Sequence, residues 1–309
     1  MIKKNILEKK KCNYSEKLNK KINFGKLPLI NDFKKTKTKK YPTILTQCSS
    51  CYLVQLKYSV KDSLIFPKNY SYLSADSKEK IYDYKSLISK LSSNYKQKNK
   101  SIVDIGGNDG SLMLIAKKRG YSTLNIEPTN VSNLSRIKGI KTINKKFSNK
   151  IAKEIIKKQN KFDFVVSTNF FAHTNDLKAI INGVKKILKD NGTLVIEVQY
   201  LYKVLKSNGF DSFHQDHKYY YTLNSIQKIL KYFDLYIFDA EFLNKQSEII
   251  RIYVNKKFKK KTLRCLNILK SENDKLVFKK IERLNKFRIK HISKIKRLIS
   301  LIVKKKKKI

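Results

Sequence analysis

The sequence predicts a doubly wound α/β domain that follows a small cysteine-containing module and precedes a basic helical tail. Three observations support this fold class: strand and helix patterns alternate, a glycine-containing turn follows the first strand, and the chain becomes continuously helical after residue 257. With 309 residues, the chain is long enough for one such domain and smaller flanking modules. We expect the boundaries at 1–56, 57–100, 101–257 and 258–309.

The alternation of strands and helices begins at residue 101. Strands that alternate with helices form parallel sheets with right-handed crossovers, so we expect a parallel sheet here. The last two strands should close its edge. The expected strands are 101–105, 123–126, 162–167, 192–197, 235–239 and 249–254, and the expected helices are 112–118, 149–158, 177–189 and 223–232.

The segments before this domain have a different character. Residues 1–56 mix lysine-rich stretches with short apolar runs around Cys48-Ser49-Ser50-Cys51, which indicates a small irregular module. Within 76–91, apolar residues recur at spacings of three and four, the period of an amphipathic helix. A helix should therefore lead into the α/β domain.

The C-terminal tail is helical and basic. Its apolar stripe consists of Ile292, Ile295, Ile299 and Ile302, and five lysines follow it, Lys304–Lys308. The pattern indicates a solvated helix that packs one stripe on the core or on a partner. A weak membrane-surface anchor is the alternative, because basic amphipathic helices are attracted to anionic lipid.

The charge of the chain suggests nucleic acid at first sight. It has 70 Lys and Arg against 24 Asp and Glu, a net charge of +46. However, the lysines are scattered over nearly every segment, and Arg, the residue suited to bidentate base or phosphate recognition, is scarce. We interpret the charge as a coding bias spread over solvated faces, and we expect no specific nucleic-acid partner.

The sequence also indicates in which cellular compartment the protein is expected. No segment has the roughly 18 consecutive apolar residues of a membrane span, and the lysine-rich start lacks the apolar core of a signal peptide. We therefore expect a cytoplasmic protein. Four cysteines in a chain of this length do not indicate a disulfide framework, so Cys48 and Cys51 call for a metal or a packing explanation.

A ligand site is expected at the first strand-to-helix junction. The turn Gly106-Gly107-Asn108-Asp109-Gly110 follows the strand that ends in Asp104-Ile105, and glycines let the backbone approach a ligand closely. Glu127 stands at the end of the second strand, where a carboxylate can accept hydrogen bonds from both ribose hydroxyls of an adenosine.

The composition of this turn favours one cofactor. A dinucleotide site normally has G-x-G-x-x-G and aims a helix N-terminus at a pyrophosphate. Here Asp109 stands where a pyrophosphate would be repelled. A cofactor that lacks phosphate and carries a sulfonium cation fits better, which indicates S-adenosylmethionine. Asp104 and Asp109 could serve its ammonium group directly, serve it through water, or only shape the turn.

An ordered set of motif blocks runs along the chain between about Cys12 and Val254. The blocks are Cys48 to Leu56 (C-x-x-C-x-L-x-Q-L), Tyr70 to Ser74, Asp104 to Gly110, Ile126 to Pro128, Asn169 to His173, Glu197 to Tyr200, and Phe210 to Tyr220, which is similar to F-D-x-x-Y-H-E-H-x-x-Y. With these blocks the chain resembles the class I methyltransferases with a Rossmann-like sheet, and more closely the nucleotide-deoxysugar C-methyltransferases.

The resemblance implies methylation of a sugar carbon next to a keto group of a nucleotide-linked sugar. A positioned base removes a proton from that carbon, and a hydrogen-bond donor stabilises the enolate, which then attacks the sulfonium methyl group. His217 is expected to be the base and Asp216 to orient it. The other catalytic candidates are Tyr70, Tyr72, His214 and Tyr220, and the cofactor-binding candidates are Asp104, Gly106, Gly107, Asn108, Asp109, Glu127 and Asn169.

The sequence also departs from the family pattern. His214, Gln215 and Gln199 replace family Tyr, His and Pro, and the last-strand motif H-G-G-S-L-R becomes 245–251 without glycines. The family's C-terminal domain is not expected in this chain. A structural zinc site would keep Cys12, Cys48 and Cys51 but lack its fourth thiolate, because Ser15 stands in that place, so zinc is doubtful.

Two further hypotheses stay open. One is an S-adenosylmethionine-dependent methyltransferase that acts on another small acceptor. The other is a non-catalytic basic module that binds nucleic acid or anionic membrane. Binding of S-adenosylmethionine, compared with salt-sensitive binding of DNA or vesicles, separates them.

Overall fold

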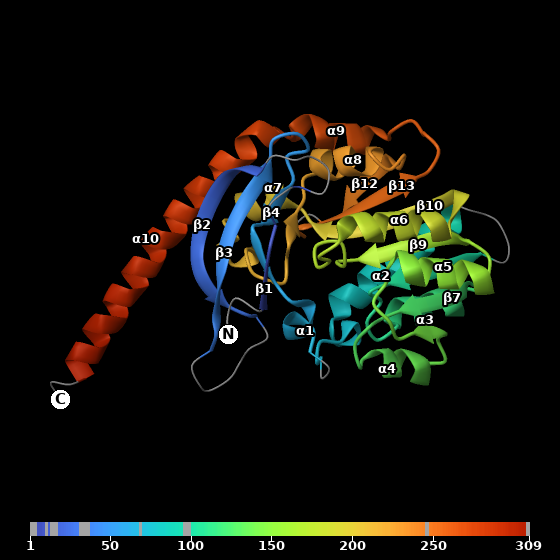
Figure 1. The fold of residues 1–309 in the computed structure, drawn as a ribbon, viewed down its shortest axis with the longest axis horizontal. Helices are drawn as coiled ribbons and strands as arrows, with labels where there is room; N and C mark the ends of the chain where they lie inside the picture. Colours follow the sequence, from blue (N-terminus) through green and yellow to red (C-terminus); the bar gives the residue numbers. More distant parts are fainter. Residues whose placement is uncertain are drawn as a thin grey trace.

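A seven-stranded sheet forms the core of the α/β domain, with helices on both faces (Figure 1). The computed structural model describes residues 5–9, 12, 18–30, 38–67, 70–94, 100–244 and 247–306. The spatial order of the strands is β12-β13-β10-β9-β6-β7-β8. Their bounds are β6 Ser101–Ile105, β7 Ser122–Ile126, β8 Thr142–Ile143, β9 Phe162–Thr168, β10 Leu188–Gln199, β12 Tyr236–Phe242 and β13 Ile249–Asn255.

The strand order creates a ligand crevice at β6. Strands β10, β9, β6, β7 and β8 run parallel, whereas β13 pairs antiparallel with both β10 and β12. From β6 the chain proceeds first to β7 on one side and later to β9 on the other. At such a switch point the connections diverge and leave space at the carboxyl ends of the strands.

The helices cover the sheet in two layers. One face packs on α2 (Lys78–Asn94) and α3 (Ser111–Lys118), and the other on α5 (Asn149–Lys158), α6 (Leu177–Ile187) and α8 (Leu223–Lys231). Side-chain oxygens of Ser148, Asp176 and Thr222 cap the N-termini of α5, α6 and α8, which fixes where these helices begin. A short helix, α4 (Ser132–Ile137), lies between β7 and β8.

The N-terminal segment is more regular than the irregular module that the sequence indicates. It forms a four-stranded antiparallel sheet in the order β11-β4-β3-β2, in which β11 comes from the C-terminal half of the chain. A separate pair joins β1 to β5. The bounds are β1 Ile6–Glu8, β2 Leu18–Pro28, β3 Lys40–Cys48, β4 Val54–Leu56, β5 Tyr58–Val60 and β11 Tyr219–Tyr220.

The remaining helices connect the two sheets and form the tail. They are α1 (Asp62–Ile65), α7 (Leu201–Lys206), α9 (Leu263–Ser271) and α10 (Asp274–Lys306), with single 3₁₀ turns at Ser74–Asp76 and Phe210–Ser212. The first part of α10 packs with α7 on the N-terminal sheet, and its end projects from the body (Figure 1). Among the described residues, no helix is both long and apolar enough to cross a membrane.

The predicted fold class is confirmed, with local differences. Each expected strand of the α/β domain is present. Helix α6 ends two residues early, because the backbone turns extended at Leu188 and continues directly into β10. Helix α4 and strand β8 were not predicted; both are short, so they show little periodicity.

Candidate active site

One cavity of about 570 Å³ opens at the carboxyl ends of β6, β7 and β9. Its floor comes from the residues that follow these strands, including Gly106, Glu127 and Asn169. A wall of N-terminal residues closes the other side, including Phe66, Tyr70 and Tyr72 from the segment between α1 and α2. The cavity therefore lies at the switch point of the sheet.

The glycine turn is shaped by two different close contacts. Gly106 lines the cavity with φ +74°, and a Cβ atom there would lie 2.8 Å from Cδ2 of Phe170. A Cβ atom on Gly107 would lie 2.1 Å from Oδ1 of Asn125, underneath the turn. Asn108, at φ 51°, lines the cavity and donates from Nδ2 to the carbonyl oxygen of Tyr72. The turn and the tyrosine segment are thus fastened together.

Glu127 lines the cavity at the end of β7. The sequence predicts that its carboxylate binds the ribose hydroxyls of the cofactor. Its Oε2 accepts a hydrogen bond from the Asn108 amide at 3.1 Å, and its Oε1 accepts from the amide and the hydroxyl of Thr129 at 2.9 and 2.7 Å. Each carboxylate oxygen has two lone pairs, so Oε1 is fully used and Oε2 keeps acceptor capacity for a ligand. The side chain is held rigidly in place for that role.

Replacing Glu127 with Ala is expected to weaken S-adenosylmethionine binding by about 1–3 kcal/mol, because the ribose hydroxyls would lose a buried acceptor. Isothermal titration calorimetry measures this change. Thr129→Ala is the matched control: it removes one support of the carboxylate but leaves the acceptor itself, and it should cost less. Unchanged affinity of Glu127→Ala would place the ribose elsewhere.

The two aspartates near the turn have different surroundings. Asp109 accepts hydrogen bonds from the amides of Ser111 and Ala75 and pairs with Lys138 at 3.0 Å, so its carboxylate is used within the turn. Asp104 is fully buried, and no hydrogen bond joins its carboxylate to another side chain among the described residues. Burial, followed by the neighbouring charge of Glu197, raises the pKa of Asp104 to about 8. Such a carboxyl group suits a cationic ligand group.

This carboxyl group predicts a pH effect on cofactor binding. Below about pH 8 Asp104 is mostly neutral in the empty site, and a bound cation favours its ionised form. Affinity for S-adenosylmethionine should therefore rise with pH, by at most tenfold per unit, until about pH 8. Calorimetry on Asp104→Asn separates this effect from titration of the ligand itself, since only the parent should keep the Asp104 contribution. If affinity rises with pH equally steeply in the parent and in Asp104→Asn, the prediction is wrong.

A cluster of histidines lies beside the tyrosine wall. His173 lines the cavity, and its Nδ1 lies 2.9 Å from the carbonyl oxygen of Asp216. The ring of His217 lies 5.0 Å from that of His173 and 4.3 Å from that of His214. A carbonyl oxygen can only accept, so Nδ1 of His173 carries the proton and Nε2 keeps a free lone pair.

Burial sets the protonation of this cluster. It lowers the pKa of His173 and of His214 to about 4 and lowers that of His217 as well, so all three imidazoles are neutral near pH 7. The pKa of Asp216 is raised to about 6, also mainly by burial. Burial, with Asp216 as the next cause, raises the pKa of Tyr70 to about 12, so its hydroxyl stays protonated. A neutral base, His173, and a neutral hydrogen-bond donor, Tyr70, thus both border the cavity.

The structure divides the predicted site residues into two groups. Those that line the cavity are Tyr70, Tyr72, Gly106, Asn108, Glu127 and Asn169. Among the described residues, the lining does not include Asp104, Gly107, Asp109, His214, Asp216, His217 or Tyr220. The hydroxyl of Tyr220 is occupied by the backbone of His214, accepting from its amide and donating to its carbonyl oxygen, both at 3.2 Å.

Sequence reasoning missed several lining residues. Asp62, Lys80, Tyr84, Lys146 and His173 all border the cavity. Of these, only His173 had a signal, because it ends the block Asn169 to His173 that supports the family resemblance. The others come from helices and loops that only the fold brings together.

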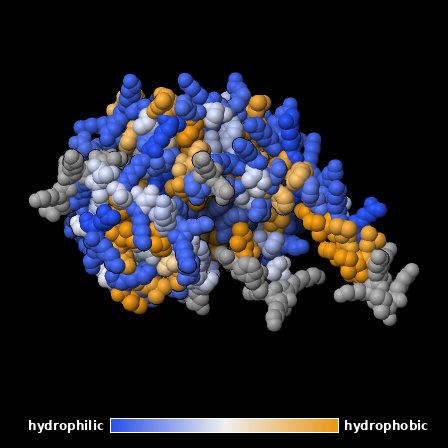
Figure 2. Space-filling view, turned by 180° about the vertical axis from the view of Figure 1, so that it is seen from behind, coloured by the Kyte–Doolittle hydropathy of each residue, from blue (hydrophilic) through white to orange (hydrophobic). Residues whose placement is uncertain are grey.

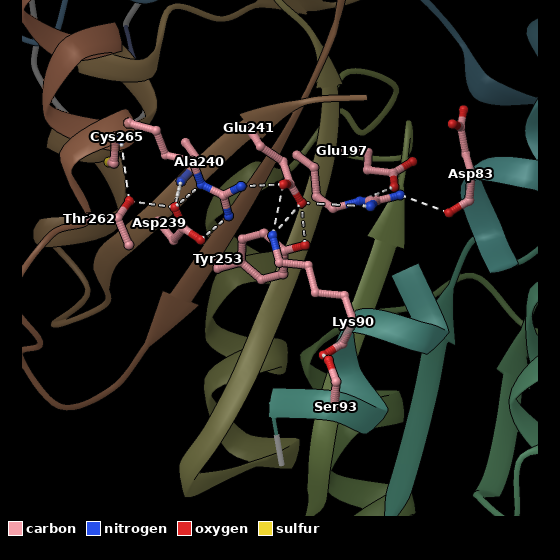
Figure 3. Close-up of polar contacts among 12 residues, drawn as sticks. Asp83, Lys90, Ser93, Glu197, Asp239, Ala240, Glu241, Tyr253, Thr262 and Cys265 are labelled. Atoms are coloured by element: carbon pink, nitrogen blue, oxygen red, sulfur yellow. Dashed lines mark hydrogen bonds and ion pairs between the residues drawn. The ribbon is translucent and has the colours of Figure 1, made fainter. Parts of the chain in front are cut away.

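A network of ion pairs links Glu197, Glu241 and Asp239 through arginine and lysine side chains (Figure 3). Arg251 donates from Nε to Oε1 of Glu197 at 2.8 Å and from Nη2 to the carbonyl oxygen of Asp83 at 2.9 Å. The other carboxylate oxygen of Glu197 lies 3.7 Å from Nζ of Lys80, a lining residue. Glu241 extends the network, because its Oε1 lies 3.8 Å from Nη1 of Arg251. Arg251 therefore fixes Glu197, whose other oxygen lies opposite Lys80 at the cavity.

Cys12, Cys48 and Cys51 come together in the N-terminal module. Their sulfur atoms lie within 4.8 Å of one another, and Sγ of Cys12 lies 3.7 Å from Sγ of Cys51. Ligands at the zinc–sulfur distance on a tetrahedron lie about 3.8 Å apart, so three corners of a zinc site are compatible with this arrangement. Ser15 lies outside the described residues. Within the part of the chain that is described, no fourth metal ligand joins the group, and zinc stays doubtful.

The fold and the cavity define a class I S-adenosylmethionine-dependent methyltransferase domain. The profile of the family described as "Methyltransferase domain" matches residues 77–239, more than half of the chain. The chain therefore belongs to this family, and the predicted enzyme class and the predicted S-adenosylmethionine cofactor are confirmed.

Individual relatives are more distant. C-methyltransferase NovU of Streptomyces niveus is 24% identical over 202 residues, 65% of this chain and 48% of that protein. Ubiquinone biosynthesis O-methyltransferase of Pelagibacter ubique is 31% identical over 157 residues, 50% of this chain and 60% of that protein. The chain thus spans roughly half the length of these relatives. A solved S-adenosylmethionine-dependent methyltransferase from Clostridium acetobutylicum has a TM-score of 0.44 and 16% identity, covering 59% of this chain and 93% of that one.

Proposed function

We propose that this protein transfers a methyl group from S-adenosylmethionine to a carbon atom of a nucleotide-linked keto-deoxysugar. One observation carries the proposal: a single cavity connects the cofactor turn at Gly106 and Glu127 with Tyr70 and His173. The similarity to a C-methyltransferase and the motif resemblance support the choice of carbon as the acceptor.

The side chains can perform the steps that this reaction needs. When bound, S-adenosylmethionine supplies an electrophilic methyl group. Glu127 holds the ribose, and the charge of Asp104, which is buried behind the cavity lining, stabilises the cationic end of the cofactor without lining the cavity itself. On the acceptor, Nε2 of His173 takes the proton from the carbon next to the carbonyl group, and the Tyr70 hydroxyl donates a hydrogen bond to the carbonyl oxygen, on which negative charge develops.

The proposed base differs from the one that the motif predicts. The family motif favours His217, whereas the cavity favours His173, because His173 is the histidine that borders it. In neutral His173, Nδ1 donates its proton to the carbonyl oxygen of Asp216. Nε2 therefore keeps its lone pair and can act as the base. We therefore propose His173 as the group that touches the substrate and His217 as a positioning residue behind it, and comparing variants of the two separates these roles.

Incubation with S-adenosylmethionine and a panel of nucleotide keto-sugars tests the proposal, with mass spectrometry of the products. One methyl group on carbon, in a keto-sugar that has exchangeable protons beside its carbonyl, is the expected result. A methyl group on oxygen of a hydroxylated acceptor would contradict it and favour the other small-acceptor hypothesis. No cofactor binding, with tight salt-sensitive binding of DNA or vesicles, would favour the non-catalytic module.

A further inference from the structure

Helix α10 carries an apolar stripe that is covered only in its first half. The covered side chains are Val277, Phe278, Ile281 and Leu284, which are buried against the N-terminal sheet and α7. Among the described residues, Arg288 makes the last polar contact between this side of α10 and the N-terminal sheet, donating from Nη2 to the carbonyl oxygen of Phe24 at 2.9 Å. The helix then continues for five more turns.

Beyond Arg288 the stripe is open to solvent. Figure 1 shows this end of α10 projecting from the body, and Figure 2 shows hydrophobic side chains gathered on it. The exposed apolar side chains are Ile289, Ile295, Leu298, Ile299, Leu301, Ile302 and Val303, each 48–59% exposed. So many half-exposed apolar residues on one projecting helix indicate a surface that becomes covered.

The charge around this stripe decides what can cover it. From Lys275 to Ile309 the sequence contains a single acidic residue, Glu282, among many lysines. Lys290, Lys294 and Lys296 are exposed on the projecting part. A second copy packed along the stripe would bring the same cations together, whereas an anionic surface would neutralise them.

We propose that the projecting part of α10, residues 289–303, lies in the headgroup region of a membrane surface that contains anionic lipid. Its apolar side chains would enter the boundary of the acyl chains, and its lysines would extend toward the lipid phosphates. The covered first half of α10 would hold the methyltransferase domain next to that surface. This inference does not depend on which acceptor is methylated.

Tryptophan fluorescence gives a direct test, because the chain contains no tryptophan. Ile302→Trp places the probe on the apolar stripe. Ser293→Trp is the matched control, since nine residues, about two and a half turns, put it on the opposite face. With phosphatidylcholine vesicles that contain phosphatidylglycerol, emission of Ile302→Trp should shift to shorter wavelength and be quenched by acyl-brominated lipid. Emission of Ser293→Trp should change little.

A charge variant tests the electrostatic part of the proposal. Lys290→Gln, Lys294→Gln and Lys296→Gln together should lower the partition coefficient by about fivefold for each lysine, about a hundredfold in total. Vesicle co-sedimentation measures it. Vesicles of phosphatidylcholine alone should bind the parent protein weakly.

The matched control removes the same charge elsewhere. Lys150, Lys153 and Lys157 are exposed on α5, and their replacement by Gln should change partitioning by less than about twofold. Equal losses in both triple variants would mean that the total charge alone drives binding, and would overturn the proposal. So would unshifted emission of Ile302→Trp on bound vesicles, or a dimer that Ile299→Ser converts to a monomer without any vesicle binding. Binding to RNA without binding to vesicles would also overturn it.

Discussion

Replacement of His173 by Asn is expected to lower kcat by about a hundredfold to ten-thousandfold, the usual cost of losing a general base. The Asn amide can still donate to the carbonyl oxygen of Asp216, as Nδ1 of His173 does at 2.9 Å, so the local structure should persist. Affinity for S-adenosylmethionine should change little, because the loss falls on the transition state. Steady-state kinetics and calorimetry on one preparation measure both quantities.

Exchange of the acidic proton of the sugar with deuterated solvent isolates the deprotonation step from methyl transfer. In the absence of the methyl donor, His173→Asn should lose this exchange, whereas His217→Asn, behind the cavity, should keep part of it. If His173→Asn exchanges at the parent rate and His217→Asn does not, then His217 is the base, as the family motif predicts.

Replacement of Arg251 by Met is expected to lower the free energy of unfolding by about 3–5 kcal/mol, because it leaves a buried carboxylate without its main partner. Arg251 is 2% exposed and Glu197 is fully buried, so water cannot compensate for the lost ion pair. Urea denaturation followed by circular dichroism measures the change.

The same network provides a matched control. Arg264 pairs with Asp239 and Glu241, but its side chain is 42% exposed. Arg264→Met should therefore cost less than about 1 kcal/mol, as partly exposed ion pairs usually do. Adding Glu197→Gln to Arg251→Met should recover part of the loss, since the uncompensated charge is removed. Similar losses for Arg251→Met and Arg264→Met would contradict this account.

The α/β core could be predicted from sequence because short segments with apolar residues alternate with helices of regular period. Strand β6 was predicted with the bounds it has, and so was helix α5. The N-terminal sheet was not predicted, because polar and apolar residues are interspersed in β2 and β3 and no long apolar run marks either strand. The two strands are defined by their pairing with each other. Local patterns do not reveal such pairing.

The cofactor half of the site was easier to predict than the acceptor half. Glu127 and the glycine turn follow directly from strand ends, where parallel sheets bind ligands. Lys80 and Lys146, by contrast, reach the cavity from a helix and a loop with no ligand-binding pattern. Asp109 was predicted to bind the cofactor because of its charge. Its carboxylate instead pairs with Lys138 and accepts hydrogen bonds from two backbone amides.

Strand β11 has a consequence for the order in which the protein folds. It pairs Tyr219 with Gln55 and Tyr220 with Val54, directly after the histidine segment 214–217. Contacts between residues so far apart in sequence close a long loop, so they form late compared with local helices and neighbouring strands. The cofactor turn depends on β6 and β7, which are close in sequence. We therefore expect the cofactor turn to form before the histidines reach their final positions, so that catalytic competence is acquired last.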